Sequence, residues 1–143
     1  SINLKESFLK AYPLRLQEKI NKQNNFIYDL FFIGWAHSDR AILLKEIDLK
    51  LQSQDLKTKF LIFVGKAAYY ISKPIRAIRT MTIQKPISTK DIAQYCSESR
   101  AILDIAHPLQ TGLTMRTIEV LFGIGRKLIT TNKDIVNYTF YNG

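Results

Sequence analysis

Cysteine and histidine are scarce in this chain, and their scarcity excludes several kinds of site. The single cysteine, Cys96, cannot form a disulfide within the chain and fits a reducing compartment. No local signature of a cysteine nucleophile surrounds it. With His37 and His107 as the two histidines, the chain has too few ligands for an ordinary zinc site. We therefore expect neither an internal disulfide nor a bound metal.

Long apolar runs are also missing. No run approaches the ~20 residues that a membrane-spanning helix needs, and the first residues do not resemble a signal peptide. The 143 residues, 46% of them hydrophobic, suit one globular domain with a substantial core. The chain starts without methionine and ends at Asn142-Gly143 soon after a helix-like stretch. We therefore expect a fragment that lacks a partner domain.

Acidic residues are few relative to basic ones. The chain has 21 Lys and Arg against 12 Asp and Glu, a net charge of +9. This balance favours anionic partners, namely nucleotide phosphates, lipid headgroups or nucleic acid, without choosing among them. Residues 66–79 combine Tyr69 and Tyr70 with several basic residues. That composition fits a solvated helix face, a contact with an anionic membrane, or single-strand binding. No nucleic-acid-binding motif accompanies it, so we expect no nucleic-acid partner.

Apolar runs and amphipathic stretches alternate along the chain, which is typical of a doubly wound α/β sheet. Near-continuous apolar runs of this kind indicate strands buried on both faces of a parallel sheet. The expected strands are residues 28–34, 60–64, 81–84, 101–106 and 127–131. The sequence thus predicts an α/β fold with a Rossmann-like, doubly wound parallel sheet across residues 26–143. Residues 1–25 are expected to be a linker or an outer helix.

Helices are expected between the strands. Ser38 is a candidate cap for a helix that buries Leu44, Ile47 and Leu51 and leaves Lys45, Asp48 and Lys50 outside. Pro74 divides residues 66–79 into two short helical pieces or a helix and a loop. Ser88 or Thr89 caps the next helix, with Ile92, Tyr95 and Cys96 inward. Asn132 caps a last short helix that runs to Tyr138.

Residues 101–132 contain most of the candidate chemistry. A strand is followed by a polar loop with one glycine, Gly112, and then by a helix that Thr114 can cap. This helix has one apolar face, and Gly123 and Gly125 end it; the apolar residues are Met115, Ile118, Leu121 and Phe122. Strand, glycine-containing loop and helix start form a common phosphate-binding arrangement, because backbone N–H groups point at the anion.

A family resemblance is carried by residues 110–132, which read QTGLTMRTIEVLFGIGRKLITTN. This run resembles the donor-binding segment of retaining GT-B glycosyltransferases. More closely, it is similar to bacterial capsule and lipopolysaccharide glycosyltransferases whose C-terminal half carries a GLTMRTIE…KKLITTN-like segment. The resemblance is specific in this central run and weaker over the rest of the chain. It implies that the chain is the C-terminal, donor-binding half of a GT-B fold.

The resemblance also implies a ribose ligand. In that family the second of two spaced glutamates typically holds the ribose of a nucleotide-sugar, and Glu119 stands at its position. Thr111, which is not an acid, stands at the position of the first. An ion pair between Glu119 and Arg116 on the helix surface is the structural alternative. Arg116 would bind phosphate as a catalytic residue, because a guanidinium in a first helical turn opposes the helix dipole unless an anion is bound.

The loop before that helix supplies further candidates. Backbone N–H groups and hydroxyls gather there, and Gly112 would let a ligand approach the main chain, or would simply occupy a left-handed turn. The expected substrate-binding residues of this loop are Gln110, Thr111, Gly112, Leu113 and Thr114.

Two histidines and an arginine lie near the expected strand ends. His107 is a candidate general acid or sugar contact, with a loop cap as the alternative. Arg40, and with it His37, would meet the diphosphate or the acceptor from the first loop. Asp104, in a buried-looking strand, needs hydrogen-bond partners and is expected to accept from neighbouring backbone N–H groups.

The expected function follows from the resemblance. The complete enzyme would move a sugar from a nucleotide-sugar donor to a glycan or lipid-linked acceptor in bacterial surface polysaccharide synthesis. It would act in the cytoplasm, with peripheral contact to the inner face of the plasma membrane, and without a cofactor or metal. A missing N-terminal domain would complete the site. The alternative is a non-catalytic basic α/β module that binds nucleotides or nucleic acid.

Overall fold

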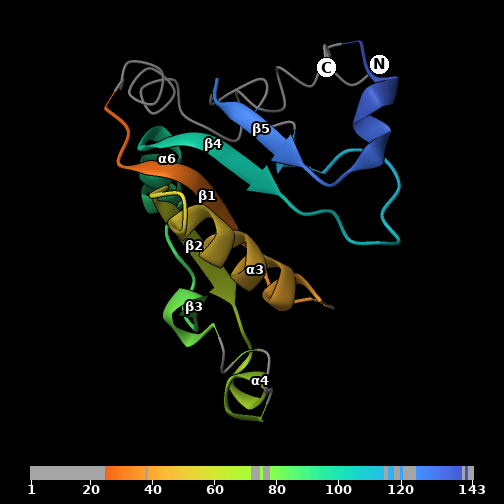
Figure 1. The fold of residues 1–143 in the computed structure, drawn as a ribbon. Helices are drawn as coiled ribbons and strands as arrows, with labels where there is room; N and C mark the ends of the chain where they lie inside the picture. The colour runs from red at the N-terminus through yellow and green to blue at the C-terminus, as the bar shows by residue number, and fades with distance from the viewer. Residues whose placement is uncertain are drawn as a thin grey trace.

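The central feature of the fold is one parallel sheet. The computed structural model describes residues 25–37, 39–71, 75, 78–114, 116–117, 120, 125–139 and 141. Five strands pair in the order β3-β2-β1-β4-β5, every pair parallel (Figure 1). They are β1 (Tyr28–Trp35), β2 (Thr58–Phe63), β3 (Thr82–Ile83), β4 (Ser99–Asp104) and β5 (Lys127–Thr130). The predicted α/β class is confirmed, and the sheet is consistent with a Rossmann-like fold.

Helices cover both faces of this sheet. Figure 1 shows α3 (Arg40–Gln52) in front of the strands and α6 (Thr89–Ser97) behind them. The shorter helices are α4 (Lys66–Ile71) and the 3₁₀ helices η1 (Arg79–Met81) and η3 (Lys133–Asn137). Residues 1–24, which hold nearly all of the expected linker or outer helix, lie outside the described residues.

The alternation of side chains along β1 produces two cores. Leu30 and Phe32 point to the α3 face, where they share a cluster with Leu44. Phe31 points to the α6 face and shares a second cluster with Cys96. Because each residue of a strand faces opposite to its neighbour, a strand covered on both sides needs the continuous apolar run that the sequence shows.

Helix α3 departs from expectation at two places. Asp48, expected outside, is only 7% exposed; Thr58 Oγ1 and Gln52 Nε2 both donate to its carboxylate. It lies four positions after buried Leu44 and therefore on the same helix face, where those two donors offset the loss of water. Ser38, the expected cap, lies outside the described residues, and the N-cap position belongs to Asp39, whose side chain makes no capping hydrogen bond.

Two other helix starts agree with the sequence. Asp91 N donates to the Ser88 side chain at 3.1 Å at the start of α6. Asp134 N donates to Asn132 Oδ1 at 3.0 Å, so Asn132 caps the last helix as expected, although that helix is 3₁₀ and ends at Asn137. The inward positions predicted for α6 are confirmed, since Cys96 is fully buried and the others pack against the α6-face core; they are Ile92, Tyr95 and Cys96.

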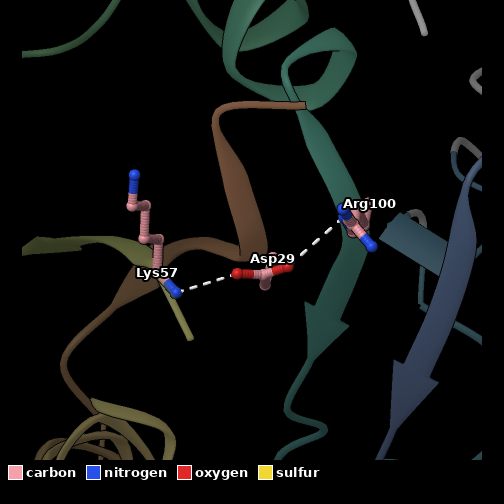
Figure 2. A network of polar contacts seen from close by, with 3 residues as sticks. All are labelled: Asp29, Lys57 and Arg100. Atoms are coloured by element: carbon pink, nitrogen blue, oxygen red, sulfur yellow. Dashed lines mark hydrogen bonds and ion pairs between the residues drawn. The ribbon is translucent and has the colours of Figure 1, made fainter. Parts of the chain in front are cut away.

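A polar network fixes the amino edge of the sheet. Figure 2 shows Asp29 of β1 between its two neighbours, with Lys57 N donating to Oδ2 at 2.9 Å and Arg100 Nε 3.3 Å from Oδ1. The guanidinium groups of Arg100 and Arg126 both lie against the Phe26 ring, at 5.7 and 4.9 Å from its centroid. These contacts hold the chain entering β1 against β4 and β5.

The basic and aromatic segment that follows β2 is only partly described. Helix α4 starts it, and Arg79 lies over the Tyr69 ring at 5.1 Å. Pro74, which was expected to divide the segment, lies outside the described residues. Among the helices that the structure describes, none is long and apolar enough to cross a bilayer.

Two leucines of α3 test the predicted core. Leu44 is fully buried and Leu49 is 56% exposed, so one substitution can be compared at two sites of one helix. We expect Leu44→Ala to lower the free energy of unfolding by about 2–5 kcal/mol, because it leaves a cavity under the sheet. Leu49→Ala should change it by less than about 0.5 kcal/mol. Urea denaturation measures both, and equal losses would contradict the placement of α3.

Candidate functional site

The order in which the chain adds strands to the sheet reverses at β1. Its two neighbours are β2, which follows it through α3, and β4, which comes much later in the chain. The loops after β1 and β4 therefore leave the sheet beside each other at its carboxyl edge. In open α/β sheets this point of reversal is where ligands bind.

A pocket of about 390 Å³ opens at this edge. Its walls come from the loop after β1, the first turn of α3, the loop after β4, and the residues that follow β5. The polar side chains that line it are those of His37, Asp39, Arg40, His107, Lys133 and Asp134, among others. The structure thus brings four of the residues selected from the sequence, His37, Arg40, His107 and Gln110, to one pocket.

Arg40 joins the ends of the two central strands. Its Nη1 donates to Trp35 O at 2.9 Å and its Nη2 donates to Ile105 O at 2.6 Å, so it links the last residue of β1 to the residue after β4. Burial lowers the pKa of Arg40, and the negative charges of Asp104 and Asp39 oppose that effect. Arg40 lines the pocket, but two of its nitrogens already hold carbonyl oxygens, so its structural role is larger than the sequence suggested.

Asp104 ends β4 and is only 6% exposed. Its Oδ2 accepts from the hydroxyls of Thr114, Thr117 and Thr130 at 2.8, 2.9 and 3.2 Å. Among the described residues, the donors to this carboxylate are therefore threonine hydroxyls of the loop end, the first helical turn and β5, and not the backbone N–H groups that the sequence suggested. A buried carboxylate with three hydroxyl donors is a structural anchor.

The Gly112 loop is shaped by residues that follow β5. Gly112 has φ +76°, a conformation that side chains disfavour, as the turn interpretation requires. Its N–H donates to Asp134 Oδ2 at 2.7 Å, and its carbonyl accepts from Asn132 Nδ2 at 2.7 Å. The Gly112 N–H, which was expected to donate to a ligand phosphate, thus donates to the Asp134 carboxylate.

His107 caps its loop and also lies at the pocket. It lines the pocket, its Nδ1 accepts from Leu109 N at 3.2 Å, and its carbonyl accepts from Gln110 N at 2.9 Å. Thr111 is exposed and Leu113 is half-buried, and neither lines the pocket. The loop therefore brings His107 and Gln110 to the pocket and leaves Thr111 and Leu113 outside it.

The helix after the loop starts as predicted. Thr117 N donates to Thr114 Oγ1 at 3.0 Å, which is the N-cap contact. Thr114 is thereby committed to the helix start and to Asp104, and it does not line the pocket. Arg116 is half-buried in the first helical turn and is also absent from the pocket wall. Glu119, the ribose candidate, lies outside the described residues.

Asp39, Lys133 and Asp134 are pocket residues that sequence reasoning did not select. The rule that polar residues after a parallel strand face the ligand edge was applied to β1 and β4 but not to β5. Applied there, it would have selected Lys133 and Asp134, which follow β5 within four positions.

No family model, curated protein or solved structure matches this chain. Within the described part of the chain, no group of three or more His, Cys, Asp or Glu side chains is placed to hold a metal ion.

Two threonines near the pocket test the anchor at Asp104. Thr117 is fully buried and donates to the carboxylate, whereas Thr111 is exposed. Thr117→Val keeps the shape but removes a hydrogen bond to a charged group, so we expect a loss of about 1.5–3 kcal/mol in unfolding free energy. Thr111→Val should cost less than about 0.5 kcal/mol. Thermal and urea unfolding measure both. If Thr117→Val left the unfolding free energy unchanged, the hydrogen bond from Thr117 to Asp104 would not contribute to stability.

Proposed function

We propose that this chain is the nucleotide-sugar donor-binding domain of a GT-B-type glycosyltransferase that acts in bacterial surface polysaccharide or lipopolysaccharide synthesis. The observation that carries the proposal is the pocket at the carboxyl edge of the sheet, between the ends of β1, β4 and β5. It supports a nucleotide ligand because doubly wound sheets bind nucleotides at this position. The finer assignment to glycosyltransferases comes from the sequence resemblance of residues 110–132.

The chemistry of the pocket suits a ligand with both hydroxyl and phosphate groups. Lys133 and the two histidines offer donors to phosphate oxygens, while the carboxylates of Asp39 and Asp134 accept from hydroxyls. A volume of about 390 Å³ lies at the lower end of the range for small-molecule sites. A cleft completed by a second domain would enclose the rest of a nucleotide-sugar and its acceptor.

In the proposed enzyme, this domain positions the donor and stabilises the departing diphosphate electrostatically. Arg116 and the helix start after Thr114 do not line the pocket, so we propose that they contact the part of the diphosphate that extends beyond it, with His107 as the proposed acid beside the sugar. The acceptor is a glycan or a lipid-linked glycan, and the enzyme works in the cytoplasm at the inner face of the plasma membrane. Its proposed ligands do not include nucleic acid.

A panel titration by calorimetry tests this proposal against the alternative of a nucleotide- or nucleic-acid-binding module. Nucleoside diphosphates and nucleotide-sugars should bind, and nucleotide-sugars should bind at least as tightly as the matching diphosphates. Tighter binding of single-stranded oligonucleotides than of any nucleotide-sugar would favour the alternative.

Substitutions at two lysines test, by the same titration, whether the ligand binds in the pocket. Lys133 lines the pocket and Lys127, at the opposite end of β5, does not. Lys133→Ala should weaken binding of a nucleoside diphosphate by about tenfold or more, the effect of losing a hydrogen bond to a charged group. Lys127→Ala removes the same charge and should change affinity by less than about twofold. Equal effects would place the ligand elsewhere.

The family assignment has its own test at Glu119. Glu119→Gln keeps the size of the side chain but weakens the acceptor for two ribose hydroxyls. We expect a nucleoside diphosphate to lose about 1.5–3 kcal/mol of binding free energy. Inorganic pyrophosphate, which has no ribose, should bind the variant and the wild type alike. An unchanged nucleotide affinity with an unchanged melting temperature would remove Glu119 from the ribose site.

A further inference from the structure

Two hydrogen bonds of different character join the Gly112 loop to the start of η3. Asn132 Nδ2 donates to Gly112 O at 2.7 Å, and the Asn132 side chain is buried, with 5% of the residue exposed. Asp134 Oδ2 accepts from Gly112 N at 2.7 Å, but Asp134 is half-buried and lines the pocket. One contact is thus buried between neutral groups, and the other is a carboxylate at the pocket wall.

The hydrogen bond from Gly112 N to Asp134 Oδ2 resembles the contact that a bound anion would make. A backbone N–H in a left-handed turn is a group that proteins use to bind phosphate oxygens. A carboxylate oxygen accepts from such an N–H in the same way, through a short charge-assisted bond. No heavy atom lies within 4 Å of the position that a Cβ on Gly112 would take, so the loop leaves open space beside its backbone.

We propose that the Asp134 carboxylate occupies, in the free protein, the position that a ligand phosphate takes at the Gly112 N–H. Phosphate binding displaces this carboxylate, and Asp134 therefore sets the affinity of the pocket for anions. This inference rests on the proposed function, in which the pocket receives a phosphorylated ligand. It also explains why Gly112, selected from the sequence as a phosphate contact, is absent from the pocket wall while Asp134 is present.

The surrounding groups permit the exchange. Because Asp134 is only half-buried and lines the pocket, its displaced carboxylate can turn away from Gly112 toward solvent and be hydrated. The Asn132 bond to Gly112 O does not depend on that carboxylate, so it keeps the loop in shape when Asp134 moves. Among the described residues, the charged side chains at the wall are those of Asp39, Arg40, Lys133 and Asp134, whose charges sum to zero. Moving Asp134 outward leaves the wall positive at the moment the phosphate arrives.

Removal of the carboxylate tests the exchange directly. Calorimetry with inorganic pyrophosphate would compare wild type, Asp134→Ala, Asp134→Asn and the control Asp39→Asn. Asp39 lines the same pocket and carries the same charge, but it has no contact with Gly112. We expect Asp134→Ala to raise pyrophosphate affinity at least fivefold. Asp134→Asn should raise it less, because the amide oxygen still accepts from Gly112, and Asp39→Asn should change it by less than twofold.

Several outcomes would overturn the inference. Equal gains for Asp134→Asn and Asp39→Asn would mean that only the net charge matters. Unchanged or weaker binding by the Asp134 variants, or no pyrophosphate binding by any of the proteins, would show that Asp134 does not hold a phosphate position. If Asp134→Ala lowers the melting temperature, the isosteric Asp134→Asn decides the comparison, and it must still bind pyrophosphate more tightly than both wild type and Asp39→Asn.

The same titration with a nucleoside diphosphate separates this inference from the proposed function. If the Asp134 variants gain pyrophosphate affinity but nucleotides bind no better than pyrophosphate, the exchange at Gly112 stands and the nucleotide-sugar assignment fails. If nucleotides bind tightly and the Asp134 variants gain nothing, the assignment stands and the exchange is wrong.

Discussion

The carboxyl edge of the sheet is organised by one buried negative charge. Asp104 ends β4 almost fully buried, and a carboxylate in that position is tolerated only when donors surround it. Its three hydroxyl donors come from the end of the Gly112 loop, the first helical turn and β5. Thr131 N adds a hydrogen bond to the Asp104 carbonyl at 3.0 Å. The need to satisfy this one residue therefore fixes the edge strand and the far end of the loop together.

The contacts of Asp104 and of Arg40 position the segments that surround the pocket. The arginine donates to a carbonyl oxygen at the end of each of the two strands β1 and β4, and it also lines the pocket. Asp104 lies near enough for its charge to act on Arg40. The other polar side chains of the pocket come mainly from loops, which is where binding residues are commonly placed on a fold that serves many ligands.

Sequence reasoning succeeded for the strands and two helix caps, and it failed at one helix position and for contacts between distant segments. The strands followed from apolar runs, and the caps Ser88 and Asn132 from short polar patterns. Asp48 was misplaced because its charge was read without its position on the helix, four residues from Leu44. The partners of Gly112 lie about 20 positions away, on a segment that returns only once the sheet is built. No local pattern specifies that return, which is why the pocket walls contributed by η3 were not foreseen.

The central position of β1 has a consequence for the order of folding. Its register with β2 is established through a single intervening helix, whereas Leu30 pairs with Ala101, about 70 positions later. At roughly 5–20 residues per second, translation takes on the order of 4–14 seconds to cover that distance. In the later part of this interval, once β2 has been made, the β1–α3–β2 unit exists without its second neighbour, and the edge of β1 along Leu30 and Phe31 is open to other nascent chains. The strand that divides the finished sheet is thus also the one that most needs protection while the chain is being made.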